Sequence, residues 1–370
     1  MHYLAVRKPV GSATLVVETR PWPACGPHQV VARIVYAGVC TTDLQILWGE
    51  RPLEPEILGH ECVARVTECG AYVQGVVPGD LVAINPNNLE DCSHKIGHTE
   101  PGFFQQVYRF DDILIQRGQV VHLPPPARTE WVLLEPLACV LRAQAMFTGP
   151  IRGRRILVVG AGVTGLLHVL AAKRHAPDEI VLANRSVSRL RFALERGVVN
   201  ASQVEVVDET LGDRLQERTT GRGFDQLIIA LAGSAGPRVT EQLLPYAVDG
   251  AEVCLFGGFS GVEPLALAGA GDLDCQALRN AAERVERRLA DGRLLVFFGS
   301  RGSGRKHYEL ARDLVLSSRI SVRPLIRASI ALPQLPALVD ELRHQELGDQ
   351  QTGGRVVVVC DQSDGGCVDT

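Results

Sequence analysis

Residues 155–165, Arg-Ile-Leu-Val-Val-Gly-Ala-Gly-Val-Thr-Gly, decide the fold of this chain. An apolar run comes first, three glycines follow, and an apolar stretch with no glycine continues from Leu166 to Ala172. A strand, a glycine turn and a helix in this order form a dinucleotide-binding unit, because the glycines let the backbone approach a pyrophosphate. The residues expected to bind the dinucleotide here are Gly160, Gly162, Val163 and Gly165.

The alternation of strands and helices continues on the C-terminal side of this unit. Apolar, strand-like segments alternate with helical stretches, which is typical of a doubly wound sheet of parallel strands. The expected strands are residues 156–159, 179–183, 204–207, 226–230 and 251–256, and the expected helical stretches include 188–196 and 240–245.

The first 145 residues follow a different pattern. Short apolar or alternating runs between Gly and Pro residues, such as 30–36, 61–67 and 80–84, predict a β-rich, barrel-like region. Beyond about residue 295 the alternation ends, and a helix at 335–342 and a strand at 354–360 are expected to return to the β-rich region. The dinucleotide-binding region is therefore expected to be an insertion.

Composition and charge exclude several classes of protein. A chain of 370 residues, 46% of them hydrophobic and 22% charged, is typical of a soluble enzyme with two domains. The formal net charge of −4 gives no reason to expect nucleic acid as a partner. The sequence also lacks a block of Lys and Arg residues that would predict binding to a membrane surface. The first residues hold no long apolar segment, so we expect no signal or transit peptide and a cytoplasmic location. Most of the ten scattered cysteines are expected to be reduced.

Cys40, His60 and Glu61 offer a thiolate, an imidazole and a carboxylate. These are the ligand types of an open catalytic zinc site, although each residue alone is an ordinary buried cysteine, turn histidine or solvated glutamate. A Lewis-acidic metal beside a hydride carrier predicts redox chemistry at a carbon that bears oxygen. The combination predicts a dehydrogenase.

Three motifs resemble those of the zinc-dependent medium-chain dehydrogenase/reductase family, which includes alcohol, sorbitol and ribitol-5-phosphate dehydrogenases. They are Gly38-Val-Cys-Thr-Thr-Asp43, Leu58-Gly-His-Glu61 and Leu134-Glu-Pro-Leu-Ala138. The resemblance covers essentially the whole chain. It implies Cys40 and His60 as zinc ligands, with Glu61 and Glu135 as exchangeable carboxylates bound directly or through water.

The same resemblance implies an α/β fold with two domains. A β-rich, GroES-like catalytic domain would comprise residues 1–148 and 295–370. A Rossmann domain with a doubly wound parallel sheet, which binds NAD(P), would be inserted as residues 149–294. The active site is expected in the cleft between them.

Two residues beside Cys40 have expected supporting roles. Asp43 is expected to accept the second ring N–H of His60, which fixes the tautomer, and capping of a turn is the alternative. Thr42 matches the family's hydroxyl beside the metal; it can donate and accept at once, which suits a relay for the substrate proton. Thr41 is small and neutral where some relatives carry a basic residue for the cofactor pyrophosphate, so that contact is missing.

The family often carries a second, structural zinc held by four clustered cysteines. The corresponding segment, residues 85–102, contains only Cys92. Cys92, His94 and His98 lack the spacing of a closed four-ligand site, so we expect one zinc per chain. The segment around His98 is similar to the polyol-phosphate branch of the family, which makes His98 a candidate substrate contact.

The end of the second strand of the nucleotide unit predicts the cofactor. A fold that selects NAD places Asp or Glu about 20 residues beyond the glycines, where this chain has Asn184 followed by Arg185. A carboxylate repels a 2′-phosphate, whereas Asn with Arg attracts one, so NADP(H) is favoured and NAD(H) is the alternative. Arg189 would extend this pocket. The competing interpretation is that Arg185 simply lies on the surface.

Residues 298–305, Phe-Gly-Ser-Arg-Gly-Ser-Gly-Arg, resemble a segment of ribitol-5-phosphate dehydrogenases. Backbone N–H groups and the guanidinium of Arg301 can surround a phosphate or a row of hydroxyls. A flexible connection between domains is an equally supported interpretation.

These features together predict an enzyme that interconverts a secondary alcohol and a ketone on a polyol, sugar, cyclitol or their phosphates. We expect a small-molecule substrate and a homo-oligomer, either a dimer or a tetramer. One alternative is a zinc-independent quinone or enone reductase on the same fold, against which the three zinc ligands argue. The other is a non-catalytic nucleotide-binding relative, which would be expected to lack Thr42 or a ligand.

Overall fold

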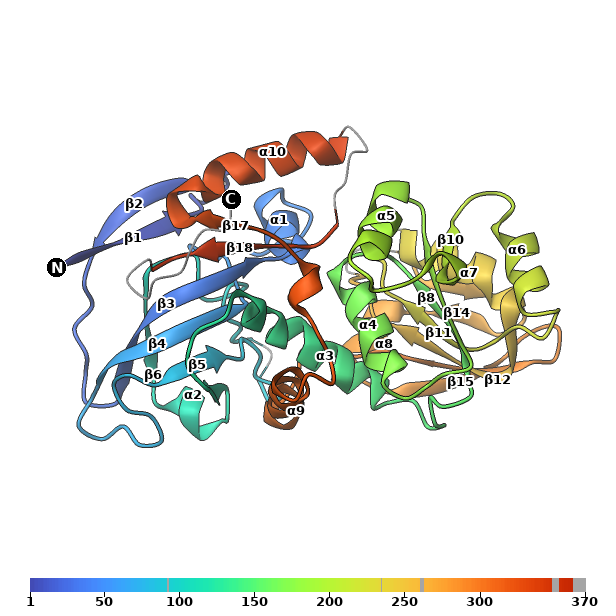
Figure 1. Cartoon of the computed structure of the whole chain (residues 1–370), viewed down its shortest axis with the longest axis horizontal. Coiled ribbons are helices and arrows are strands. Elements are labelled where there is room, and N and C mark those ends of the chain that lie inside the picture. Colours follow the sequence, from blue (N-terminus) through green and yellow to red (C-terminus); the bar gives the residue numbers. More distant parts are fainter. Residues whose placement is uncertain (92, 234, 260–262, 348–352, 362–370) are drawn as a thin grey trace.

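A computed structural model describes residues 1–91, 93–233, 235–259, 263–347 and 353–361. The chain folds into two lobes, each built around its own seven-stranded sheet (Figure 1). Within the part of the chain just given, no helix has the length and apolar character needed to cross a membrane.

The β-rich lobe consists mainly of antiparallel strands. Its sheet has the order β17-β18-β3-β4-β5-β7, with β6 paired to β3, while β1 and β2 form a separate pair. The C-terminal strands β17 and β18 join β3, so the end of the chain returns to the β-rich half, as expected. The strands are β1 (His2–Arg7), β2 (Val16–Pro21), β3 (Gln29–Val39), β4 (Cys62–Cys69), β5 (Leu81–Ile84), β6 (Val107–Asp111), β7 (Val120–Leu123), β17 (Ile326–Ala331) and β18 (Arg355–Val359).

The second lobe carries the sheet that the glycine turn predicts. Six strands in the order β10-β9-β8-β11-β12-β16 are parallel, and β15 pairs antiparallel at the edge. Starting from β8, the chain adds β9 and β10 on one side of it and then β11, β12 and β16 on the other side. This is the strand order of a Rossmann fold, and the predicted fold class is confirmed. The strands are β8 (Arg155–Val159), β9 (Glu179–Asn184), β10 (Val204–Val206), β11 (Phe224–Ile229), β12 (Ala247–Leu255), β15 (Arg284–Arg288) and β16 (Leu294–Phe298), and a small pair is formed by β13 (Leu265–Leu267) and β14 (Gly271–Leu273).

Ten α-helices lie in the described part of the chain. Those associated with the β-rich sheet and the junction are α1 (Thr41–Leu47), α2 (Ile113–Gln116), α3 (Leu134–Gln144), α9 (Arg305–Leu316) and α10 (Leu335–Leu347). Those of the Rossmann lobe are α4 (Val163–Lys173), α5 (Val187–Glu195), α6 (Leu211–Arg218), α7 (Ala235–Leu243) and α8 (Cys275–Ala281).

Helix α3 lies at the junction of the two lobes and packs against α4 and α9 (Figure 1). Nine of its 11 residues are buried. One apolar core runs from Val35 and Val63 of the first sheet, past α3, to Ile156 and Leu182 of the second. Because apolar packing is continuous across the junction, α3 fixes the position of one lobe relative to the other.

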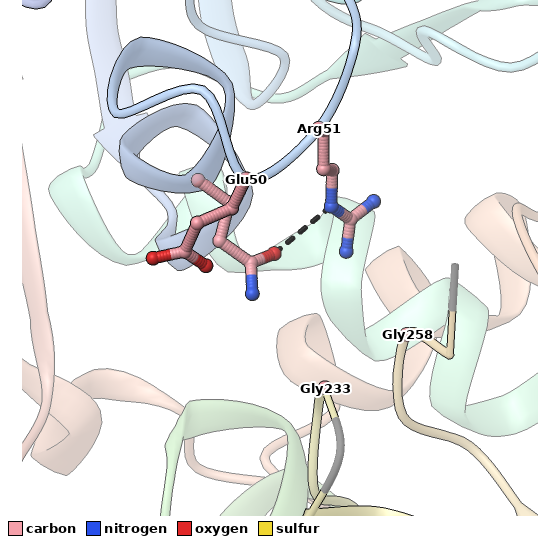
Figure 2. Close-up of a pocket in the computed structure, with 5 residues that line it drawn as sticks. Glu50, Arg51, Gly233 and Gly258 are labelled. Atoms are coloured by element: carbon pink, nitrogen blue, oxygen red, sulfur yellow. Dashed lines mark hydrogen bonds between the residues drawn. The ribbon is translucent and has the colours of Figure 1, made fainter. Parts of the chain in front are cut away.

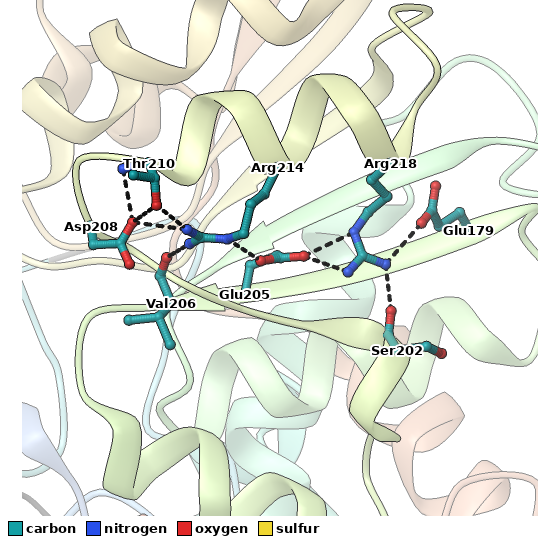
Figure 3. A network of polar contacts seen from close by, with 8 residues as sticks. All are labelled: Glu179, Ser202, Glu205, Val206, Asp208, Thr210, Arg214 and Arg218. Carbon is teal, nitrogen blue, oxygen red and sulfur yellow. Dashed lines mark hydrogen bonds and ion pairs between the residues drawn. The ribbon is translucent and has the colours of Figure 1, made fainter.

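An ion-pair network covers the outer edge of the Rossmann sheet at β10 (Figure 3). Glu205 of β10 accepts hydrogen bonds from Nε of Arg214 (2.8 Å) and Nε of Arg218 (3.1 Å), both on α6. Arg218 also donates to Glu179 of β9 (3.3 Å), and Arg214 donates to Asp208 (3.0 Å). The network ties α6 to the edge strand with charged groups, which disfavours pairing of that edge with another chain.

One expected helical stretch is part of a longer helical segment. Residues 240–245, expected as a helical stretch, form the end of α7 and the start of a 3-10 helix, Leu244–Tyr246, with a proline at its beginning. The domain division at 148–149 and 294–295 remains a proposal. Its second boundary falls at the start of β16, which pairs with β12 and β15 of the Rossmann sheet.

Candidate active site

Three candidate metal ligands meet at one edge of the β-rich sheet. Cys40 follows the end of β3, and His60 and Glu61 come directly before β4. These strands are antiparallel neighbours with Ala37 opposite Cys62, so the end of one and the start of the other share an edge. One ligand atom each of Cys40, His60 and Glu61 lies within 4.8 Å of the others.

Asp43 holds this group in place. Its Oδ1 accepts hydrogen bonds from Nδ1 of His60 (3.0 Å) and the backbone N–H of Gly59 (3.1 Å), and its Oδ2 accepts from the backbone N–H of Cys40 (2.9 Å). The carboxylate assigns the ring proton to Nδ1, which leaves Nε2 of His60 free to bind a cation. Asp43 both orients the imidazole and caps the start of α1, so the two expected roles coexist.

Arg355, the first residue of β18, was not among the expected site residues. Its Nη2 donates to Oε1 of Glu61 (2.7 Å) and its Nη1 donates to the backbone oxygen of Val39 (2.6 Å); the side chains of Arg355 and Glu61 are both buried. The sequence held a signal, since an arginine that begins an otherwise all-valine buried strand requires a buried partner. Oε2 of Glu61 has no hydrogen-bond partner among the described residues.

Burial and neighbouring charges shift the pKa values of the three candidate ligands, lowering one and raising two. Burial raises the pKa of Cys40, but Arg355 and His60 outweigh it and bring the pKa to about 6. Burial raises the pKa of Glu61 well above its usual value, with Arg355 opposing. The pKa of His60 is also raised well above its usual value, because Asp43 and Cys40 outweigh its burial. A thiolate, an imidazole and a carboxylate with one free oxygen form a donor set that fits a divalent cation such as zinc.

Thr42 and His98 lie beside the candidate ligands. Thr42 is the second residue of α1 and is half-buried. The rings of His98 and His60 lie with their centroids 4.8 Å apart. Burial, together with the nearby His60, lowers the pKa of His98 to about 3, so this imidazole stays neutral at physiological pH.

Glu135 is buried on α3, outside the group of three ligands. Its Oε1 accepts hydrogen bonds from Nδ2 of Asn87 (3.1 Å) and from the thiol of Cys139 (3.4 Å). The structure thus holds the carboxylate of Glu135 through other side chains, and its role as an exchangeable ligand remains a proposal. Of the residues considered for a second metal, Cys92 lies outside the described residues, and His94 contacts Glu100.

The glycine turn leaves room for a ligand at the start of α4, whose first residue is Val163. Gly160 has φ +110°, and a Cβ there would lie 2.7 Å from the backbone oxygen of Ala230. A Cβ at Gly165 would lie 1.7 Å from the oxygen of Gly160, so this glycine permits close packing of helix and strand. At Gly162 an added Cβ meets no atom within 4 Å. The second glycine therefore borders open space at a helix N-terminus, where a pyrophosphate binds.

Asn184, the last residue of β9, is tied to this turn. Its Oδ1 accepts from the backbone N–H of Ala161 (3.1 Å), and its Nδ2 donates to the oxygen of Ser186 (3.1 Å). Arg185 follows directly and is exposed, and Arg189 is half-buried on α5. The structure brings Asn184 and the glycine turn together, with the guanidinium of Arg185 free to meet solvent or a ligand.

Arg301 lies in the connection between β16 and α9. Its backbone oxygen accepts a hydrogen bond from Nη1 of Arg142 on α3 (2.7 Å). Its own Nε is buried and has no hydrogen-bond partner in the part of the chain that the structure describes. The segment is thus anchored to the junction of the lobes.

Comparison with known proteins agrees with this geometry. A family model described as the alcohol dehydrogenase GroES-like domain matches residues 26–123. The chain is 29% identical over 277 residues to L-threonine 3-dehydrogenase of Pyrococcus furiosus, covering 69% of this chain and 75% of the relative. It is 30% identical over 237 residues to sorbitol dehydrogenase of Halalkalibacterium halodurans, covering 59% and 66%. A crystal structure of a putative zinc-binding dehydrogenase from Sinorhizobium meliloti, bound to NADP, superposes with a TM-score of 0.72 at 23% identity, covering 97% of this chain and 99% of the other.

Proposed function

We propose that this member of the medium-chain dehydrogenase/reductase family, an NAD(P)-dependent dehydrogenase, interconverts a secondary alcohol and a ketone with the help of one bound zinc ion. The proposed substrate is a polyol, sugar or cyclitol, free or phosphorylated. The observation that carries the proposal is the group of Cys40, His60 and Glu61, oriented by Asp43, in the same molecule as the glycine turn.

Cys40 and His60, with Glu61 or Glu135 as the exchangeable carboxylate, would hold the zinc. The ion supplies Lewis-acid chemistry when bound, since it polarises the substrate oxygen and lowers the pKa of its hydroxyl. Asp43 accepts a hydrogen bond from Nδ1 of His60 and keeps Nε2 of the ring directed to the ligand group. Arg355 neutralises Glu61, which limits the excess negative charge of the site.

A nicotinamide cofactor held at the glycine turn would accept a hydride from the carbon that bears the hydroxyl, and the hydroxyl proton would leave separately. Thr42 is half-buried and directly follows the ligand segment in the sequence, so its hydroxyl can accept that proton and donate its own toward solvent. His98 stays neutral beside His60 and can orient a substrate hydroxyl without adding charge.

The group of three ligands supports this proposal over a zinc-independent quinone or enone reductase, which needs no thiolate, imidazole and carboxylate at one point. We also propose that the cofactor is NADP(H), with Arg185 and Arg189 near the 2′-phosphate, and that the protein is a homo-oligomer. The interactions of Asn184 with Ala161 and Ser186 support a site at this end of β9.

A panel of sorbitol, ribitol, sorbitol 6-phosphate and L-threonine, each with NAD⁺ and NADP⁺, tests the proposed function. We expect oxidation of at least one polyol or polyol phosphate, loss of the rate after treatment with a chelator, and its return on addition of zinc. L-Threonine is included because of the relative with that activity. Oxidation of L-threonine alone would overturn the proposed substrate class, and a chelator-resistant rate would overturn the role of zinc.

A further inference from the structure

Three arginines from separate segments gather near the candidate active site. Arg51 lies in the loop after α1, Arg279 on α8 and Arg301 beyond the end of β16. Arg51 lies beside Gly258, and the guanidinium of Arg279 lies 5.9 Å from the ring centroid of the next residue, Phe259. Arg279 also lies beside Gly299, two residues before Arg301. A pocket beside Arg51 is lined by Gln45, Glu50, Gly233 and Gly258, and Figure 2 shows the arginine extending toward the two glycines.

Glycines at the carboxyl ends of two parallel strands make room for these side chains. Gly258 follows β12, and a Cβ there would lie 2.5 Å from Nη2 of Arg51. Gly299 follows β16, and a Cβ there would lie 2.4 Å from Cγ of Arg279. The carboxyl edge of an open parallel sheet is where ligands of such folds bind. The glycines therefore admit two arginines into the ligand-binding edge.

The three arginines are half-buried, and the cluster lacks the anions that normally accompany guanidinium groups removed from solvent. Nε of Arg51 donates to Gln45 (2.9 Å) and Nη1 of Arg279 donates to Gln276 (3.3 Å), and both acceptors are neutral amides. The Nε atoms of Arg279 and Arg301 are buried and have no hydrogen-bond partner in the described segments. Among the described residues, none of the three forms an ion pair within 4.0 Å, and the one acidic residue lining the pocket is the exposed Glu50.

The pKa values of two of these arginines are lower than usual. Burial, with added repulsion from Arg51 and Arg301, lowers the pKa of Arg279 to about 10. Burial also lowers the pKa of Arg51, although Cys40 and Glu50 oppose it. Buried like charges are unfavourable unless a group of opposite charge joins them. The site is therefore complementary to an anion that the protein itself does not provide.

The cluster adjoins the metal-ligand group, and Arg301 is its member farthest along the sheet from the glycine turn. Arg51 interacts electrostatically with Cys40 and Asp43, and Arg279 with Cys139, which donates to Glu135. In the sheet order β8-β11-β12-β16, the strand before the glycine turn is three positions from β16. At about 4.8 Å between neighbouring strands this separation is roughly 14 Å. The cofactor pyrophosphate at the glycine turn is thus too far away to neutralise Arg301.

We propose that Arg51, Arg279 and Arg301 bind an acidic group, a phosphate or a carboxylate, that the hydroxylated substrate carries. The inference rests on the proposed dehydrogenase function and narrows its substrate class. Guanidinium groups bind both anions through paired N–H donors. With the acidic group held there, the hydroxyl to be oxidised extends toward the group of Cys40, His60 and Glu61.

Kinetics with three six-carbon probes test the proposal. We expect the KM for sorbitol 6-phosphate or for gluconate to be at least about tenfold lower than the KM for neutral sorbitol. The acidic probe with the lower KM shows whether the site prefers a phosphate or a carboxylate. Arg51→Met and Arg279→Met should each raise KM for the preferred acidic probe roughly 10–100-fold, the effect of losing one charge-assisted contact. Arg305→Met removes the same charge at an exposed position, with the side chain 62% exposed, and should not change KM.

A binding measurement separates this inference from the proposed function. With saturating cofactor present, inorganic phosphate should raise Tm of the wild type and of Arg305→Met, and raise it much less for Arg51→Met and Arg279→Met. Arg279→Lys, which keeps the charge, should retain part of the shift if Arg279→Met fails to fold. Equal KM values for sorbitol and both acidic probes would overturn the arginine site and leave the dehydrogenase intact. A phosphate-dependent Tm without any alcohol oxidation would overturn the proposed function and leave the arginine site intact.

Discussion

Asp43 connects three parts of the site, because a single carboxylate accepts hydrogen bonds from Cys40, Gly59 and His60. Asp43→Asn retains the shape but loses one acceptor and places an amide N–H against a donor. We expect zinc affinity to fall about 10–100-fold, the usual effect of removing a group that orients a ligand. Competition with a chromophoric chelator measures the change. An unchanged affinity would show that the fold alone orients His60.

Arg185 carries the prediction of cofactor preference. Arg185→Ala should weaken NADP(H) binding by about 1.5–3 kcal/mol, the scale of a charge-assisted hydrogen bond, and leave NAD(H) binding nearly unchanged. Titration of the cofactor's fluorescence provides both affinities. Tighter binding of NAD(H) than NADP(H) by the wild type would contradict the interpretation of Asn184 and Arg185.

The candidate ligands could be predicted from the sequence because their chemistry is local. Cys40 lies beside Thr42 and Asp43, and His60 adjoins Glu61, so short motifs reveal them. Arg355 lies 294 residues beyond Glu61, and only the pairing of β18 with β3 brings the two together. The cluster of three arginines was likewise hidden, because α8 and the strand ends that assemble it are distant in sequence. Strand pairing brings together residues that are distant in the sequence, and the periodicity of the sequence does not predict such contacts.

Among the elements, β10 and α6 are joined by ion pairs at the edge of the Rossmann sheet. Glu205 is 9% exposed between Arg214 and Arg218, and these two arginines outweigh its burial and lower its pKa below 4.5. Its stabilising effect is therefore present above about pH 4.5 and is lost as the pH falls through the lowered pKa.

Glu205→Gln should lower the free energy of unfolding by about 1.5–3 kcal/mol at neutral pH, because two guanidinium groups lose their anion. The difference from wild type should shrink as the pH falls below the lowered pKa. Urea unfolding at several pH values measures it, with Glu195→Gln at an exposed position of α5 as the control. A pH-independent difference would show that packing, not charge, is lost.

Strands of the Rossmann sheet were predictable because each is a short apolar run bounded by turn residues. The helices α1 and α3 of the β-rich half were not expected. Helix α1 has seven residues, too few to show periodicity. Helix α3 is buried on nearly all sides, so no polar face marks it as a helix. The edge strand β15 contains three arginines, and it is a strand because it pairs with β16.

At the scale of the whole molecule, α3 carries Glu135 and Arg142 into the junction of the lobes, and a continuous apolar core surrounds it. The ligand group of the β-rich lobe and the carboxyl edge of the Rossmann sheet are thereby held in a fixed relation. This arrangement would suit a reaction in which one lobe polarises a hydroxyl and the carbon that bears it gives a hydride to a cofactor bound by the other lobe.

Quantification of zinc by elemental analysis tests the central claim most directly, with the wild type compared with Cys40→Ala. We predict one zinc per chain in the wild type and almost none in Cys40→Ala, with the circular dichroism spectrum and cofactor binding retained, since an open catalytic site contributes little to folding. Two tightly bound zinc ions in the wild type, or an unchanged zinc content in Cys40→Ala, would contradict the account.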